Sequence, residues 1–147
     1  MTDFEAAADV AWQVYRLVRS VPGRLSDPRL IFLRDFPIGS CDALAYATAA
    51  MLLGRGLGDW WVIVQGDGTR WHVWLEWRAS DGSTLFSVDA TAHQFSETPE
   101  PFVGLGQTPT ARRFKEPVSA TRFSQLAKSW PRDAELALLH HVREHLT

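Results

Sequence analysis

The segment from Gly39 to Leu53 constrains the fold more than any other part of the sequence. After Cys41 it is almost wholly apolar and rich in alanine, and Gly54 and Gly56 follow as stop signals. A helix that is apolar on all sides is a buried helix. The other elements must therefore enclose it. A chain of 147 residues with 46% hydrophobic residues can do so as one compact domain over residues 1–147.

Hydrophobic periodicity and turn signals predict the other elements. Steps of three and four residues predict an amphipathic helix from Asp3 to about Arg19, ended by Val21-Pro22-Gly23. A short antiparallel meander is predicted with strands at Trp60–Gln65, Arg70–Arg78 and Thr84–Asp89. Residues 24–38 are predicted as a connection with one helical turn near Pro28, and Glu97–Pro109 as a loop. A strand is predicted over Ala111–Lys115 and a short helix over Arg122–Ser129. A last helix, capped by Ser129, is predicted to run to about His145.

The formal charge of −2 and the single cysteine exclude several classes of function. A nearly neutral chain has no field that gathers polyanions, so neither nucleic acid nor an anionic membrane is an expected partner. Cys41 is the only cysteine, which rules out an internal disulfide and a CxxC site and is typical of a reducing compartment. The N-terminus is acidic, unlike a secretory signal, and no apolar run approaches about 20 residues. We expect a cytoplasmic protein; the sequence indicates no oligomeric state.

We expect neither a metal nor an organic cofactor. His141 and His145 lie four residues apart on the last predicted helix, but no Cys, Asp or Glu completes a ligand set on that face. Gly104-Leu105-Gly106 lacks the strand-to-helix context of a phosphate-binding loop. The stretch from Arg112 to Lys115 is locally basic, a pattern typical of a solvated face.

Cys41 is the candidate nucleophile. It follows Gly39-Ser40 at the start of the buried helix, with Ser40 as the predicted N-cap and Asp42 in the first turn. A helix N-terminus stabilises a thiolate, which is the nucleophilic form of cysteine. The alternative is a cysteine that simply fills the core, as many free cysteines do.

His72 and Asp89 are predicted to share one face of the meander. Alternation along the second strand gives a core face made of Trp71, Val73, Leu75 and Trp77. The opposite face carries His72, Trp74 and Glu76. A two-residue turn at Asp81-Gly82 pairs Trp74 with Asp89, diagonal to His72, whereas a turn slipped to Ser80-Asp81 puts Asp89 directly across from His72. Taken singly, His72 also fits a surface or hydrogen-bonded histidine, and Asp89 also fits a cap of the next turn.

These motifs resemble the transglutaminase-like branch of the papain-like cysteine enzymes. The resemblance covers residues 36–95 and consists of Gly39-Ser40-Cys41 opening a helix, His72-Val73-Trp74-Leu75-Glu76 on a strand, and Val88-Asp89-Ala90-Thr91 at a strand end. It implies that Cys41 is the nucleophile, His72 the general base and then acid, and Asp89 the residue that orients the histidine. It also implies acyl chemistry on an amide of a peptide or protein, as in a peptidase, amidase or deamidase.

Other residues are candidates for binding the substrate. The Cys41 backbone N–H is the predicted first oxyanion donor, and the side chains of Gln65 and Gln94 are candidates for the second. Trp74 and either Trp60 or Trp61 are candidates for the walls of a substrate groove, although core packing explains these rings equally well. Two rival functions remain: a non-catalytic peptide- or protein-binding module of the same fold, and a structural domain with a core cysteine.

Overall fold

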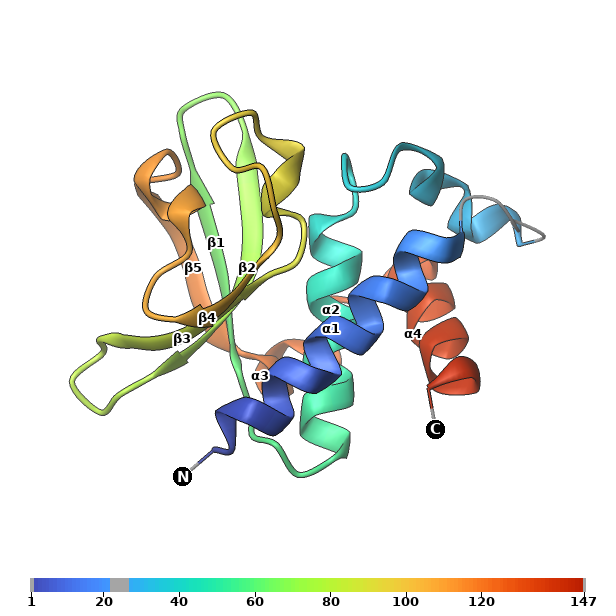
Figure 1. Ribbon diagram of the computed structural model, residues 1–147, viewed down its shortest axis with the longest axis horizontal. Helices are drawn as coiled ribbons and strands as arrows, with labels where there is room; N and C mark the ends of the chain where they lie inside the picture. Colours follow the sequence, from blue (N-terminus) through green and yellow to red (C-terminus); the bar gives the residue numbers. More distant parts are fainter. Residues whose placement is uncertain (1, 22–26, 147) are drawn as a thin grey trace.

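A computed structural model describes residues 2–21 and 27–146 of the protein. In chain order its elements are α1 (Phe4–Ser20), η2 (Pro28–Asp35), α2 (Cys41–Gly54), β1 (Trp61–Gly66), β2 (Trp71–Arg78), β3 (Thr84–Asp89), η3 (Ala92–Gln94), β4 (Phe102–Leu105), η4 (Pro109–Arg112), β5 (Glu116–Arg122), α3 (Phe123–Leu126) and α4 (Asp133–His145). The sheet lies on one side and the long helices on the other (Figure 1). The protein is therefore a mixed α+β structure, as the helices and the antiparallel meander predicted from the sequence imply.

The strands form one antiparallel sheet in the order β4-β3-β2-β1-β5. Its three central strands are the predicted meander, which is confirmed to within one residue at each boundary. Because successive strands of this meander are neighbours, β2 has a pairing partner on both sides and lies in the middle of the sheet.

The two outer strands correct the sequence analysis. β4 lies inside Glu97–Pro109, which is predicted as a loop, and β5 starts at Glu116, after the strand predicted over Ala111–Lys115. Residues 109–112 form a 3-10 turn instead. Both predictions are wrong because an edge strand pairs on one side only and need not bury alternate side chains: β5 is exposed along almost its whole length and contains Pro117.

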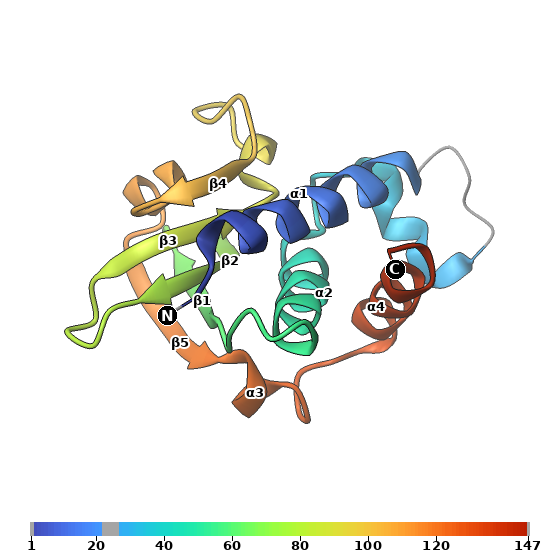
Figure 2. The same cartoon turned by 60° about the horizontal axis from the view of Figure 1, so that its bottom comes forward.

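The predicted buried helix is α2, and its burial is confirmed. All residues from Ala43 to Leu52 are buried. β2 contacts α2 on one side, α4 contacts it on the other, and α1 crosses over it (Figures 1 and 2). The helix ends at Gly54, and Gly56 supplies the left-handed turn that follows, with φ of 71°.

The ends of the other long helices agree in part with the sequence. The predicted first helix is α1, and Asp3 caps it by accepting a hydrogen bond from the Ala6 N–H at 3.0 Å. Val21 closes α1, while Pro22 and Gly23 of the predicted stop lie outside the described residues. The last helix starts later than predicted: Arg132, not Ser129, is the N-cap residue, and its N–H donates to Glu135 at 3.2 Å.

The β2–β3 hairpin has the predicted register but a different turn. Leu75 pairs with Val88, so the next pair along the ladder is Trp74 and Asp89. The turn contains three residues, with the Ala79 N–H donating to the Ser83 carbonyl at 2.9 Å, and a bulge after Trp77 compensates for the extra residue. The register that puts Asp89 directly across from His72 is therefore wrong.

The two faces of the sheet are both covered. On the helix side Val73, Leu75 and Trp77 join the main core, as predicted, but Trp71 does not: 71% of its surface is exposed, because it lies at the start of β2. The other face carries His72, Trp74 and Glu76, which are all buried. A second apolar cluster covers them, made of Ile63, Trp74, Phe95 and Phe114. The chain between β3 and β5 thus folds back over this face.

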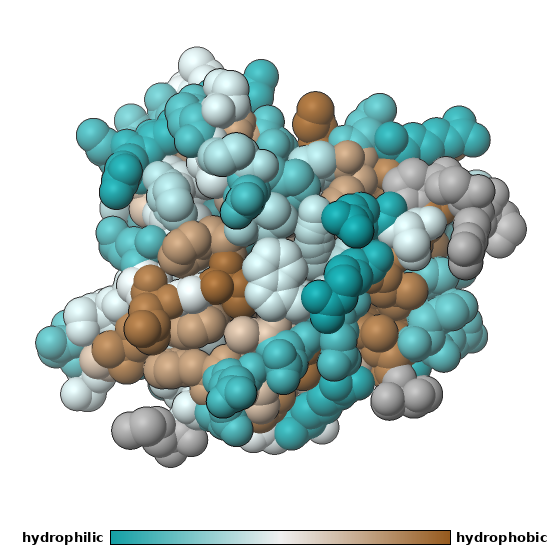
Figure 3. Space-filling view, viewed as in Figure 1, coloured by the Kyte–Doolittle hydropathy of each residue, from teal (hydrophilic) through white to brown (hydrophobic). Residues whose placement is uncertain are grey.

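Some apolar side chains stay at the surface. They gather over β3 and β4 in the view of Figure 3, where Leu85 and Leu105 are exposed. Over residues 2–21 and 27–146, no helix has both the length and the apolar character that a membrane crossing requires.

Candidate active site

Cys41 is the first residue of α2, as predicted, and its side chain is partly exposed. Ser40 occupies the N-cap position but does not cap the helix with its side chain, which corrects the expected role. Its hydroxyl instead donates to the Pro37 carbonyl at 2.7 Å and is buried there. The first turn of α2, which begins at Cys41, therefore has no side-chain cap from Ser40.

His72 and Asp89 are joined by a buried hydrogen bond of 2.8 Å between Nε2 and Oδ1. Both side chains have no exposed surface. The other carboxylate oxygen of Asp89 accepts from the hydroxyls of Thr108 and Thr110, each at 2.7 Å. Neither threonine stands out in the sequence, because Thr108-Pro109-Thr110 has the composition of a loop. Together the two hydroxyls fix the carboxylate that holds the ring.

The second ring nitrogen of His72, Nδ1, is the one left for Cys41. It is buried, and no described group makes a well-aligned hydrogen bond to it. Burial lowers the pKa of His72, but hydrogen bonding with Asp89 and with Cys41, together with their charges, raises it to about 9. The thiol thus lies near enough to influence the ring without an aligned hydrogen bond.

Aromatic rings enclose the His72 imidazole. The ring centroids of Phe95, Phe114 and Trp74 lie 4.9, 5.4 and 5.5 Å from it. Trp74 is itself held by a 2.7 Å hydrogen bond from its indole N–H to Glu76. The imidazole is therefore dry on the side of these rings, which strengthens its interaction with Asp89.

The other candidates for substrate binding in β1 lie near its opposite ends. Gln65 is half-buried and pairs with His72 across the β1–β2 ladder. Trp61 is half-buried at the other end of β1, with the guanidinium groups of Arg78 and Arg122 over its ring at 5.7 and 5.0 Å. Gln65 thus lies beside His72, whereas Trp61 does not.

Two other candidates have structural partners. Trp60 is buried in the main core and donates its indole N–H to the Leu57 carbonyl at 2.9 Å. The Gln94 amide donates to the Thr91 hydroxyl at 3.3 Å. Of the two candidate glutamines, Gln94 therefore already has a hydrogen-bond partner in the structure.

The cleft beside the thiol is narrow. Its lining comes from Cys41, Leu44, Ala45, Thr48, Val73, Trp74, Leu75, Val88, Ala90 and Thr91. Its volume is about 10 Å³, close to the minimum for a single water molecule. The partly exposed side of Cys41 is therefore the side from which a larger molecule can reach the thiol.

His93, a second histidine close to Asp89 in the sequence, lies in η3 and does not bond to Asp89. Its ring packs against Tyr15 and Phe36, and its Nε2 lies 3.5 Å from the Tyr15 hydroxyl. Burial lowers its pKa, which the charge of Asp89 only partly offsets. Since His72, Thr108 and Thr110 already occupy both oxygens of Asp89, His93 has no carboxylate to orient it.

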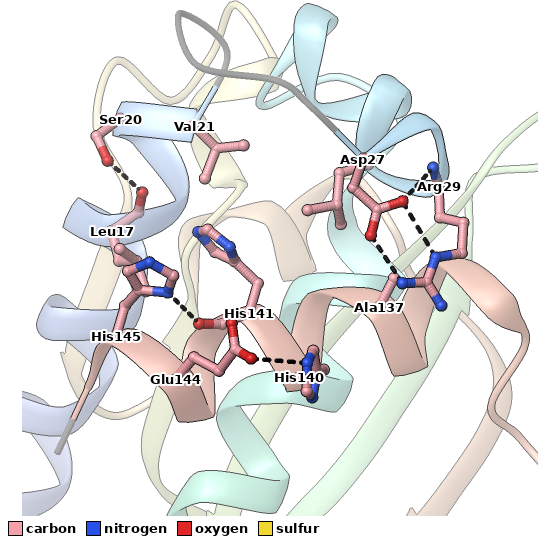
Figure 4. Close-up of a pocket in the computed structure, with 11 residues that line it drawn as sticks. Leu17, Ser20, Val21, Asp27, Arg29, Ala137, His140, His141, Glu144 and His145 are labelled. Carbon is pink, nitrogen blue, oxygen red and sulfur yellow. Dashed lines mark hydrogen bonds and ion pairs between the residues drawn. The ribbon is translucent and has the colours of Figure 1, made fainter.

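A separate cavity of about 470 Å³ lies between the end of α1, the start of η2 and α4 (Figure 4). His140, His141 and His145 line it. His140 pairs with Glu144 at 2.9 Å, and the Nδ1 of His145 hydrogen-bonds to the His141 carbonyl at 2.8 Å. In the part of the chain that the structure describes, no three His, Cys, Asp or Glu residues are grouped to hold a metal ion.

Comparisons of the chain with family models, with curated proteins and with solved structures gave no match. The resemblance to transglutaminase-like enzymes therefore stays a prediction that depends on three short motifs and on the geometry around Cys41, His72 and Asp89.

Proposed function

We propose that the protein is a cysteine hydrolase or acyltransferase that acts on amides through a thioester on Cys41. The observation that carries the proposal is the arrangement of His72: one ring nitrogen is held by Asp89 at 2.8 Å, and the other is buried without a partner on the side of the thiol. An imidazole held in this way has one defined tautomer and one nitrogen free for proton transfer.

The proposed reaction has two steps. The Cys41 thiol first gives its proton to His72 Nδ1, and its sulfur attacks the carbonyl carbon of the amide. The C–N bond then breaks, and His72 Nδ1 passes the proton to the departing amine. Water or a second amine then attacks the thioester, passes its proton to His72, and breaks the C–S bond. Asp89 does not change protonation in this scheme; it orients the ring and stabilises the imidazolium.

The start of α2 supplies the charge stabilisation that the reaction needs. Its first-turn N–H groups have no side-chain cap and can donate to the negative oxygen of the tetrahedral intermediate. Gln65, opposite His72, is the proposed second donor. These roles agree with the papain-like, transglutaminase-like fold that the motifs imply. The proposed substrate is a peptide or protein, and the lone free thiol suits a reducing compartment such as the cytoplasm.

Detection of the acyl-enzyme tests the proposal. The protein is incubated with p-nitrophenyl acetate and followed by intact mass spectrometry, with Cys41→Ala and urea-unfolded protein as controls. We expect the wild type to gain one acetyl group on Cys41 faster than the unfolded chain and then to lose it. Acetylation no faster than in the unfolded protein would contradict the proposal.

A non-catalytic binding module is the second candidate. The small volume of the cleft beside Cys41, about 10 Å³, and the complete burial of His72 favour it. In that case Cys41 would acetylate slowly, and the acetyl group would persist on the protein.

A further inference from the structure

Arg113 belongs to a basic stretch that the sequence predicts as a solvated face, but it differs from its neighbours. Arg112 and Lys115 are exposed, whereas Arg113 is half-buried and makes several specific contacts. Its Nε donates to Asp67 at 3.1 Å, and its Nη1 donates to Glu97 at 3.1 Å. An arginine with two carboxylate partners is fixed in position more firmly than a solvated one.

The Arg113 guanidinium also lies over the two phenylalanines that cover His72. Its central carbon is 4.9 Å from the Phe95 ring centroid and 5.2 Å from that of Phe114. These rings are 4.9 Å from each other, and they pack on the imidazole at 4.9 and 5.4 Å. Arg113, the phenylalanine pair and His72 therefore form a continuous stack of contacts from the surface to the site.

Asp67 connects this stack to the hairpin that carries His72. It lies in the β1–β2 turn, where its Oδ1 accepts from the N–H groups of Thr69 and Arg70 at 2.9 and 2.8 Å. Its second oxygen binds Arg113. The guanidinium thus ties the turn that precedes His72 to the segment that folds over it.

We propose that Arg113 is a positioning residue for His72: it holds Phe95 and Phe114 closed over the imidazole, which keeps water from the His72–Asp89 hydrogen bond and directs Nδ1 toward Cys41. The inference depends on the proposed function, because it assigns Arg113 an effect on the chemistry of Cys41 that acts only through His72.

A double-mutant cycle on the reactivity of Cys41 tests it. The rate of alkylation by iodoacetamide at pH 6 is measured for the wild type, Arg113→Ala, His72→Ala and the double variant, with Arg112→Ala as the matched control. We expect Arg113→Ala to slow alkylation roughly tenfold and to have no further effect once His72 is absent. Arg112→Ala should be alkylated as fast as the wild type. The rate for Arg113→Lys should lie between those of the wild type and Arg113→Ala, because lysine keeps the charge but lacks the planar guanidinium.

The outcomes separate a positioning role from a structural one. A wild-type rate for Arg113→Ala overturns the inference, and so does equal slowing with and without His72. If Cys41 in His72→Ala is alkylated as fast as in the wild type, the proposed function is contradicted, whatever the result for Arg113→Ala. Should Arg113→Ala not fold, Asp67→Asn and Glu97→Gln release the guanidinium one partner at a time; unchanged alkylation in both overturns the inference.

Discussion

The hydrogen bond from His72 to Asp89 allows a sharp prediction about the substitution Asp89→Asn. An asparagine side chain has nearly the same shape as aspartate. Its oxygen can still accept from His72 Nε2, and its amide can donate to the hydroxyls of Thr108 and Thr110, which now accept. The change therefore removes the negative charge and leaves the packing almost intact.

The structure gives the size of the effect. Burial lowers the pKa of His72, yet its neighbours raise it from 6.5 to about 9, and Asp89 is the largest of these raising influences. The difference corresponds to about 3–4 kcal/mol, because each pKa unit is worth about 1.4 kcal/mol. Loss of an opposite charge at this distance lowers a pKa by about one to three units, so we expect the His72 titration midpoint in Asp89→Asn to fall below about 8.

The assay is a pH titration of the histidine ring carbons by NMR on the labelled protein, with the His72 signal assigned by its absence in His72→Gln. Thermal unfolding of Asp89→Asn, monitored by circular dichroism, shows whether the variant is folded. A folded variant in which His72 still titrates near pH 9 would refute the account of the Asp89 contact.

Three further predictions concern stability. Thr108→Val and Thr110→Val should each lower the free energy of unfolding in urea by about 1.5–3 kcal/mol, because each removes a hydrogen bond to a buried carboxylate; an unchanged unfolding midpoint would contradict this. Since the folded pKa of His72 lies above 6.5, its contribution to stability should be complete below about pH 6.5 and disappear as the pH rises through about 9, a loss that His72→Gln should not show. Leu52→Ala should cost about 2–5 kcal/mol in the same urea assay, because Leu52 is fully buried; a loss below 1 kcal/mol would contradict the central position of α2.

The parts of the fold that sequence predicts well have a strong pattern of their own. The apolar run from Ala43 to Leu52 has only one physical outcome, which is burial, and the structure shows it. The β2–β3 register is also predictable, since a slip by one residue would turn Leu75 and Val88 out of the core. That constraint preserves the pairing even though the turn has three residues in place of two.

The parts that sequence does not predict depend on contacts made elsewhere. β4 and β5 are edge strands whose main-chain pairing leaves little trace in their side chains, so the pattern around Pro117 does not indicate a strand. Thr108 and Thr110 are likewise invisible as site residues, because they reach Asp89 across a separation of about 20 positions in the chain.

The candidate site, like the fold, is only partly predictable from the sequence. The sequence alone proposes Cys41, His72 and Asp89, and it predicts that His72 and Asp89 share one face of the sheet. In the structure these two side chains are hydrogen-bonded to each other. The sequence does not predict that Ser40 turns its hydroxyl to Pro37, because a serine before a helix is ordinarily a capping residue. The alternation of side chains along β2 also does not predict that Trp71 is exposed. Alternation places Trp71 on the core side of the sheet, but it lies at the strand end, where the helices do not cover it.

The central claim is that the Cys41 thiol reacts through His72, and the pH dependence of its alkylation tests this most directly. Iodoacetamide labelling is measured from about pH 5 to pH 10 for the wild type and for His72→Ala, and modification is counted by intact mass. The account predicts fast labelling of the wild type at pH 6 and at least about tenfold slower labelling of His72→Ala at the same pH. The claim is contradicted if the two proteins give the same pH profile, with the midpoint near pH 8.5 that is typical of an ordinary free thiol.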